Sequence, residues 1–284
     1  MTFRILVMKN ILALAGLALV LGLGGCQTND TTTGTVYNPR SNIDSLSTVI
    51  KDNPSDPSAL NLRGVAYTKY GQYKSAIKDF NAALALQPAY FQAISNRGLA
   101  YMKMGDANRA LQDFNKVIAL SPTYPVVYVN RGRLYRAQGK YDAALRDFTR
   151  AVSLDSGYAL AYHYRGLIYQ AKNQNGRAIK DFTKAISLKA GQTQPIYARG
   201  NSYLALGDYR AAADDFSNII EMEPNSPAAY FGRGNAHEGM RKWQAAVNDY
   251  DQALKLDPRH RGARKARARA YKQYLKVASL KKKS

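Results

Sequence analysis

Cysteine, histidine and glutamate are scarce in this chain of 284 residues, which has one cysteine, three histidines and glutamate only at positions 221, 223 and 238. A single cysteine cannot form a disulfide within the chain, so the fold must be stabilised by its core alone. No His or Cys cluster has metal-ligand spacing, and the sequence contains neither a glycine-rich phosphate loop nor a nucleophile motif. The sequence therefore argues against an enzyme, and it predicts no metal and no cofactor.

A period of 34 residues is the dominant feature of the sequence and divides residues 57–260 into six ungapped units. In each unit an Arg-Gly pair is followed after three residues by Tyr (His237 in the last unit), nine residues later by Ala, and four residues after that by a ring. Apolar residues recur at helical spacing, so each unit is predicted to form two amphipathic helices joined by a glycine-containing turn. The units are 57–90, 91–124, 125–158, 159–192, 193–226 and 227–260.

This pattern resembles the tetratricopeptide repeat family, whose unit has an apolar or aromatic residue at position 4, Gly at 8, Tyr at 11, Ala at 20, an aromatic at 24, Ala at 27 and Pro at 32. Ser156 and Ala190 replace the closing proline in units three and four. The resemblance implies an all-α fold, a right-handed α-solenoid of six helix-turn-helix units with a capping helix at each end. The small residues at positions 8 and 20 are expected to meet where two helices cross. Unit two matches the family pattern with Ile94, Gly98, Tyr101, Ala110, Phe114, Val117 and Pro122.

Two opposite charges share the period of the repeat, with Arg at position 7 and Asp at position 23 of all six units. We interpret them as structural ion pairs between the two helices, because an Arg fork fits a carboxylate in bidentate fashion. A ladder of catalytic acids and bases is the alternative. The sequence leaves open whether the partners belong to one unit or to adjacent units. The residues are Arg63, Asp79, Arg97, Asp113, Arg131, Asp147, Arg165, Asp181, Arg199, Asp215, Arg233 and Asp249.

The N-terminus resembles a bacterial lipoprotein signal. Arg4 and Lys9 precede an apolar run at 11–23 that is short for a membrane span, and the run ends in the sequence LGGC. By this resemblance residues 1–25 are a signal peptide and Cys26 is lipidated, for example with palmitate.

Residues 26–40 then form the lipidated cysteine and a flexible tether. A signal anchor with an incidental cysteine is the alternative, and translation could also begin at Met8. Gln27 after the cysteine favours the periplasmic face of the outer membrane, because the family often has Asp there in proteins that stay at the inner membrane.

Both ends of the repeat array are predicted to be capped by helices, since a solenoid needs polar terminal faces. Residues 41–56 resemble the second helix of a preceding half-unit and form the N-terminal cap. Residues 261–284 continue the register of a first helix and carry ten Lys or Arg and no acid. The cations selected in this basic tail are Arg264, Lys265, Arg267, Arg269, Lys281, Lys282 and Lys283.

By the resemblance, positions 2, 5, 9 and 12 of the first helices line a groove for a partner. Rings stand there that the fold does not demand, and two arginines lie nearby, which suits an extended or helical peptide with an acidic residue. An unoccupied, solvated face is the alternative. No unit has the Lys-Asn pair with which chaperone-binding members clamp a carboxylate. The candidate groove residues are Arg133, Arg136, His163, Tyr197, Asn201, Phe231 and Asn235.

The formal net charge of +21 would by itself suit nucleic acid. A lipid-anchored envelope protein does not meet nucleic acid, so a protein or peptide in the periplasm, peptidoglycan or anionic lipid is the better expectation. A homo-oligomer is compatible with the sequence.

We predict a membrane-anchored periplasmic scaffold or adaptor that binds its partners through the groove and serves cell-envelope assembly or the regulation of cell-wall enzymes. In this it is similar to NlpI-type adaptors. One alternative is a pilotin-like assembly factor for a pilus or secretion pore. A second alternative is a protein that binds peptidoglycan or anionic lipid directly through its basic tail.

Overall fold

The computed structural model describes residues 39–281, and every regular element within them is an α-helix. Residues 1–38 and 282–284 lie outside the described part, and with them the predicted signal peptide, Cys26, Lys282 and Lys283. The segment Pro39–Ser284 is a compact unit with its own core. The helices are α1 (Pro39–Asp52), α2 (Pro57–Lys69), α3 (Tyr73–Leu86), α4 (Phe91–Lys103), α5 (Ala107–Leu120), α6 (Pro125–Ala137), α7 (Tyr141–Leu154), α8 (Ala159–Ala171), α9 (Asn175–Leu188), α10 (Thr193–Leu206), α11 (Tyr209–Met222), α12 (Pro227–Gly239), α13 (Trp243–Leu256) and α14 (Arg261–Lys281).

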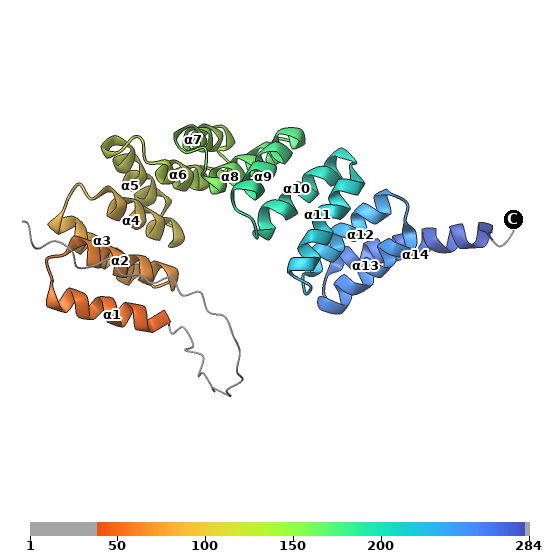
Figure 1. The fold of residues 1–284 in the computed structure, drawn as a ribbon, viewed down its shortest axis with the longest axis horizontal. Coiled ribbons are helices and arrows are strands. Elements are labelled where there is room, and N and C mark those ends of the chain that lie inside the picture. Colours follow the sequence, from red (N-terminus) through yellow and green to blue (C-terminus); the bar gives the residue numbers. More distant parts are fainter. Residues whose placement is uncertain (1–38, 282–284) are drawn as a thin grey trace, which may run out of the picture. The chain divides into compact units, whose positions relative to one another are not determined.

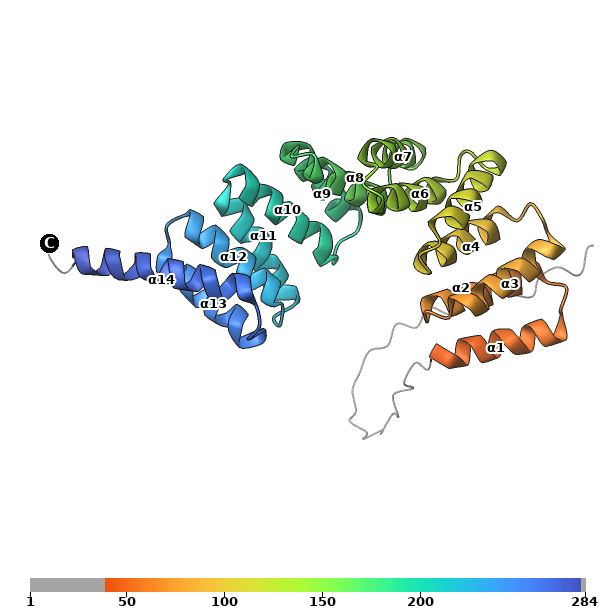
Figure 2. The ribbon, with the colours of Figure 1, turned by 180° about the vertical axis from the view of Figure 1, so that it is seen from behind.

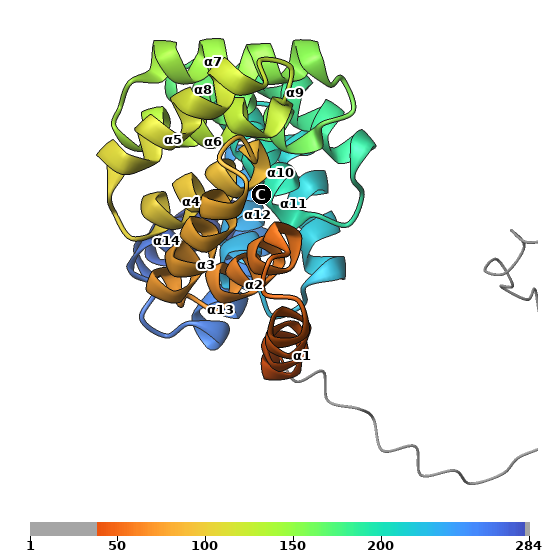
Figure 3. The same ribbon diagram turned by 90° about the vertical axis from the view of Figure 1, so that its left-hand side faces the viewer.

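Each unit is a pair of helices, here called helix A and helix B, from α2 with α3 in unit one to α12 with α13 in unit six. Helix A packs on helix B of its own unit, and helix B packs on helix A of the next unit, so the pairs follow one another in chain order (Figures 1 and 2). The predicted all-α solenoid of helix pairs is confirmed. At the ends, α1 packs on α2 in the place of a preceding helix B (Figure 3), and α14 packs on α13 in the place of a following helix A.

The ring at position 24 is the centre of each unit's core. All six rings are fully buried, and each contributes roughly 1.5–3 kcal/mol through the apolar surface it removes from water. A Cβ atom built on the glycine at position 8 would lie 2.6 Å from the ring of Phe80 in unit one and 2.8 Å from that of Phe114 in unit two. The atoms nearest to such a Cβ belong to the ring at position 24 and not to the alanine at position 20, so the ring is what requires glycine at position 8. The buried rings are Phe80, Phe114, Phe148, Phe182, Phe216 and Tyr250.

The turn between helix A and helix B depends on position 15, which has a positive φ in all six units. Glycine occupies this position in four units, while Asn173 and Arg241 adopt a φ of 58° in the other two. The corresponding residue after unit six is Leu275, and there the chain stays helical to Lys281 instead of turning. A left-handed backbone is costly for leucine, which is consistent with the greater length of α14 among the described helices A. Its C-terminal part projects beyond α13 (Figures 1 and 2).

The N-terminal capping helix differs slightly from the predicted segment 41–56. It begins at Pro39, so the last two residues of the predicted tether are helical, and it ends at Asp52, before Pro54. Proline has no N–H to donate and its fixed φ suits the first turn of a helix, which is consistent with this start.

Candidate functional site

The Arg-Asp pairs lie within units and join helix A to helix B. In units one to five the arginine Nε and Nη2 atoms donate to the two carboxylate oxygens of the aspartate at 2.6–2.9 Å. The aspartates are almost completely buried, whereas the arginine side chains are about one-fifth exposed. The hydrogen bond to Asp113 raises the pKa of Arg97, and this effect outweighs the lowering caused by burial.

In five of the six units the remaining arginine nitrogen, Nη1, donates to the unit or half-unit before it. Arg97 Nη1 donates to Asn81 Oδ1, and Arg131 Nη1 donates to Asn115 Oδ1, both at 2.7 Å. Position 25 of the preceding unit supplies these acceptors, which are Ser47, Asn81, Asn115, Thr183 and Ser217 for the arginines at 63, 97, 131, 199 and 233. Arg165 binds Asp181 within its own unit, and the other five arginines also join neighbouring units, which is a structural role.

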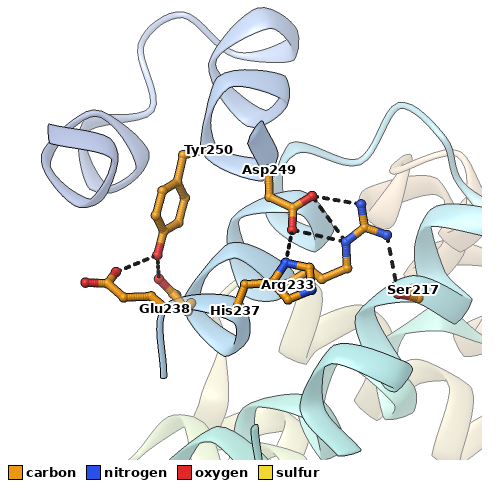
Figure 4. A network of polar contacts seen from close by, with 7 residues as sticks. Ser217, Arg233, His237, Glu238, Asp249 and Tyr250 are labelled. Carbon is orange, nitrogen blue, oxygen red and sulfur yellow. Dashed lines mark hydrogen bonds and ion pairs between the residues drawn. The ribbon is translucent and has the colours of Figure 1, made fainter. Parts of the chain in front are cut away.

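Unit six extends this network with side chains that the other units lack (Figure 4). His237 stands where the other units have Tyr, and its Nδ1 lies 2.8 Å from Asp249 Oδ2, on the carboxylate that also binds Arg233. The hydroxyl of Tyr250 lies 2.9 Å from Asn235 Oδ1 and 2.8 Å from Glu238 Oε2. Burial and the neighbouring Glu238 raise the pKa of this hydroxyl.

A pocket of about 470 Å³ lies between helices A of units four, five and six, which is within the usual size of a ligand pocket. Its wall is mostly apolar, with Leu167, Ala198 and Ile219 beside polar groups of helices A and of the loop before α12. Thr193 Oγ1 donates to Glu223 Oε1 at 2.8 Å and so closes one side. The lining residues are His163, Leu167, Gln170, Thr193, Gln194, Tyr197, Ala198, Asn201, Ile219, Glu223, Ser226 and Ala228.

His163 is the most unusual member of this pocket. Among the residues that the structure describes, its Nδ1 is the one buried side-chain polar atom without a hydrogen-bond partner. Burial lowers the pKa of His163 to about 4, and the charge of Arg136 adds to this effect. The imidazole is therefore neutral at neutral pH, and Glu223 is the ionisable acid among the lining residues.

The rings predicted to stand free in the groove are half-buried and pack on other rings. Tyr197 lies edge-on to Phe216 with a centroid distance of 5.6 Å, and His163 lies 5.8 Å from Phe182. Phe231 packs on Tyr250 at 5.9 Å and also contacts His260. Position 5 thus lies beside the core ring at position 24, and units one to three, which have Asn61, Ser95 and Val129 there, show that the fold does not demand a ring at this position.

The pocket brings together three of the predicted groove residues, His163, Tyr197 and Asn201. Arg133 and Arg136 lie over the ring of Tyr164, next to His163 in the chain, with centroid distances of 5.2 and 5.7 Å. The other two predicted residues lie elsewhere: Phe231 packs in unit six, and Asn235 faces the hydroxyl of Tyr250.

Sequence reasoning missed the pocket residues outside helices A. Ile219 lies on a helix B, and Glu223 and Ser226 lie in the following loop. No groove position of the family pattern points to them.

The basic tail is partly engaged in holding α14 to the array. Arg269 donates to both oxygens of Glu238 at 2.6 and 2.8 Å, and Arg267 pairs with Asp251. Burial opposes ionisation of Glu238, but the hydrogen bonds from Arg269 and Tyr250 outweigh it and lower its pKa. Arg264 donates to the carbonyl oxygen of Pro258 at 2.7 Å. Lys265 is exposed, and Lys281 is the last residue of α14.

Residues 39–281 contain no group of three or more His, Cys, Asp or Glu side chains placed to hold a metal ion. None of the helices described there combines the length and the apolar character that crossing a bilayer requires.

A stack of helix pairs with a mostly apolar surface pocket is the architecture of a protein-interaction scaffold. Profiles described as TPR repeat match residues 66–105 and 132–173, and profiles described as tetratricopeptide repeat match residues 91–124, 114–146, 159–192, 197–239 and 227–260. Together these matches span residues 66–192 and 197–260, so the chain belongs to the tetratricopeptide repeat family. Members of this family are generally non-catalytic scaffolds for protein partners.

Solved structures with the same fold come from proteins of different roles. A chain of the APC/C hetero-tetramer Cut9–Hcn1 is 16% identical with a TM-score of 0.69, and the match covers 82% of this chain and 46% of that one. This chain thus spans less than half the length of that relative. YrrB, a TPR protein with an unusual peptide-binding site, is 19% identical with a TM-score of 0.60, covering 66% and 97% of the two chains.

PilW, a widely conserved type IV pilus biogenesis factor, is 21% identical with a TM-score of 0.60, covering 67% of this chain and 89% of PilW. At these identities the likeness concerns the fold alone. A search of curated protein sequences finds no significant match.

Proposed function

We propose that the protein is a lipid-anchored scaffold of the bacterial envelope that binds an extended segment of a partner protein at the pocket between α8, α10 and α12. The observation that carries the proposal is this pocket, which is mostly apolar in a surface otherwise rich in charge. A wall containing Leu167, Ala198 and Ile219 fits one bulky apolar side chain, and burying such a side chain contributes roughly 1.5–3 kcal/mol.

The polar groups around the pocket favour a peptide backbone as the rest of the ligand. Asn201 and Gln194 line the pocket and can each donate and accept a hydrogen bond. Gln170 is already committed, because its amide nitrogen donates to the carbonyl oxygen of Ala198 and to Ser202.

The arginines near Tyr164 favour an acidic residue in the partner segment. Arg136 is exposed and Arg133 is half-buried, and both lie on α6, the helix A that precedes α8. Within residues 39–281 neither arginine forms a salt bridge, and Arg133 donates one long hydrogen bond, to Asn130 Oδ1 at 3.5 Å. Both guanidinium groups therefore keep donors for a carboxylate. The proposed ligand therefore has a bulky apolar residue with an acidic residue nearby.

Anchoring is the second part of the proposal. Lipidation of Cys26 would hold the scaffold at the membrane, since two or three acyl chains give stable attachment at roughly 0.8 kcal/mol for each buried methylene. The periplasmic face of the outer membrane and an adaptor role similar to that of NlpI-type proteins remain the preferred setting.

The test is site-specific photo-cross-linking in cells. A photoreactive residue at Asn201, inside the pocket, is expected to give a discrete adduct with one partner. The same residue at Leu206, exposed at the end of the same helix, is the matched control and should give none.

A Leu167→Lys change should abolish the Asn201 adduct because it places a charge in the apolar wall. Leu160→Lys, on the same helix but outside the lining, should leave the adduct intact. Equal adducts at both cross-linking positions, or an adduct that Leu167→Lys does not weaken, would contradict the pocket as the binding site.

A pilus or secretion-pore assembly factor is the second candidate, favoured by the fold that this chain shares with PilW. The identity of the Asn201 adduct separates the two readings. A secretin or pilus subunit would support the assembly factor, and a cell-wall hydrolase or protease would support the adaptor.

A further inference from the structure

Two half-units stand at the ends of the described repeat array. Counting back from residue 57, α1 occupies positions 17–30 of a unit and is thus a helix B, and no helix A precedes it within residues 39–281. Counting on from residue 260, α14 begins at position 1 and is thus a helix A, and no helix B follows it within these residues. Together the two segments supply the positions of one complete unit.

The uncovered face of α14 is apolar. Ala268 and Tyr271 stand at positions 8 and 11, which in every complete unit face helix B. Ala268 is exposed, Tyr271 is 43% exposed and Leu275, one turn further on, is 49% exposed.

The opposite end of the array has a matching apolar surface on α1 and α2. Val49 of α1, at position 27, is 48% exposed, although this position faces helix A in complete units. Leu62 of α2, at position 6, is 54% exposed. Position 6 is buried or half-buried in all later units and in α14, because the preceding helix A covers it there. In the described part of the chain, no preceding helix A covers Leu62.

Two positions that touch each other in the complete units both differ in the half-units. Position 8 is Ala268 instead of glycine, and position 24 is Leu46 instead of a ring. In the complete units a Cβ at position 8 meets the outer atoms of the ring, down to 2.6 Å in unit one. Leucine has no atoms beyond Cδ, so it leaves room for the methyl group of Ala268.

The charged positions 7 and 23 also differ from those of the complete units in a way that lets α14 and α1 pair. Arg267 stands at position 7, and Ser45 stands at position 23, where the complete units have aspartate. Arg267 takes its carboxylate from Asp251 at position 25 of unit six, where the other units have uncharged Ser, Asn or Thr. A helix B without aspartate can thus cover Arg267 and leave no buried unpaired charge. The α1 end has Asp44, Asp52 and Asp56 against Arg40 and Lys51, so it is close to neutral and does not repel the all-basic α14.

We propose that α14 of one copy docks against α1 and α2 of a second copy, so that α14 and α1 form a hybrid repeat unit and the array continues from chain to chain. The occupant of each uncovered end is the other end of the same protein. Such a contact is heterologous, so each copy keeps one free end and the assembly grows as an open chain. The proposal is independent of the peptide pocket, which none of these residues lines.

The test uses residues 39–284, which form a compact unit with its own core, in sedimentation velocity over a range of concentrations. The wild-type segment is expected to form species larger than a dimer as its concentration rises. Leu62→Lys blocks one end, and the double change Tyr271→Lys with Leu275→Lys blocks the other. Each blocked variant alone should remain a monomer.

An equal mixture of the two blocked variants is the decisive sample. Each has one intact end, so the mixture should form a dimer of twice the monomer mass and nothing larger. Leu206→Lys, an exposed leucine at neither end, should associate like the wild type, and unchanged helical circular dichroism verifies folding in all variants. A wild-type segment that stays monomeric at its highest soluble concentration overturns the proposal. So does a mixture that stays monomeric while the wild type associates.

Discussion

The ion pair of unit three offers a quantitative test of how the array is held together. Arg131 and Asp147 form two hydrogen bonds at 2.8 and 2.7 Å, and their side chains are 20% and 6% exposed. Replacing Arg131 by Leu strands a nearly buried carboxylate, and replacing Asp147 by Leu leaves the arginine only its bond to Asn115. We expect each single change to cost about 3–5 kcal/mol, the range for breaking a buried pair. Arg131→Leu should cost more than Asp147→Leu, because the aspartate that it leaves unpaired is more deeply buried than the arginine.

The double change should cost less than either single change, because it leaves no lone charge and adds apolar surface. The expected coupling energy is about 2–3 kcal/mol. Urea unfolding followed by far-ultraviolet circular dichroism measures it. With a slope of about 2 kcal/mol per molar urea, each single change lowers the midpoint by about 2 M. Midpoints should be compared before free energies, since an array of repeats need not unfold in two states.

Arg150→Leu is the matched control, because Arg150 is an exposed arginine on α7, the helix that carries Asp147. A surface arginine of this kind contributes about 1 kcal/mol or less, so its midpoint should barely move. A coupling energy near zero between Arg131 and Asp147 would refute the reasoning. The Arg-Asp pattern would then reflect duplication of the unit and not a stabilising bridge.

Gly98→Ala should destabilise by about 1–3 kcal/mol in thermal unfolding, because its Cβ would lie 2.8 Å from the ring of Phe114; alanine in an unobstructed helix would stabilise instead. Arg241→Gly should raise the free energy of unfolding, measured in urea, by about 1 kcal/mol, since Arg241 holds a φ of 58°. Cys26→Ala should abolish incorporation of labelled palmitate. Label in the mutant protein would contradict Cys26 as the lipidated residue. The pKa of His163 is lowered from 6.5 to about 4 in the folded protein, so the unfolded chain binds the proton first on acidification. Stability should therefore fall by about 1–3 kcal/mol between pH 6.5 and 4, and a His163→Gln variant should lose this part of the pH dependence in urea titrations.

The repeat made most of the fold predictable, because a 34-residue period places the same side chains in the same contacts six times. Arg at position 7 and Asp at position 23 could be recognised as partners from their shared period. Their assignment to one unit needed the structure, since sequence spacing does not show whether a helix B lies closer to its own helix A or to the next one.

The site was less predictable, because a pocket depends on how three units pack and not on one helix. Tyr197 occupies a groove position in the family, but its ring reaches sideways over Phe216, and periodicity gives no information about that direction. Ile219 and Glu223 enter the pocket from a helix B and a loop, where the groove positions of the family offer no guide.

Unit six shows how the last helix of the array is held in place. Its core ring is Tyr250 instead of phenylalanine, and the added hydroxyl lies against Glu238, which in turn binds Arg269 of α14 (Figure 4). Arg267, two residues before Arg269 on α14, binds Asp251 of α13. These contacts tie α14 to both α12 and α13. A terminal helix fixed by such contacts keeps its apolar face in a defined orientation, as docking of a second copy requires.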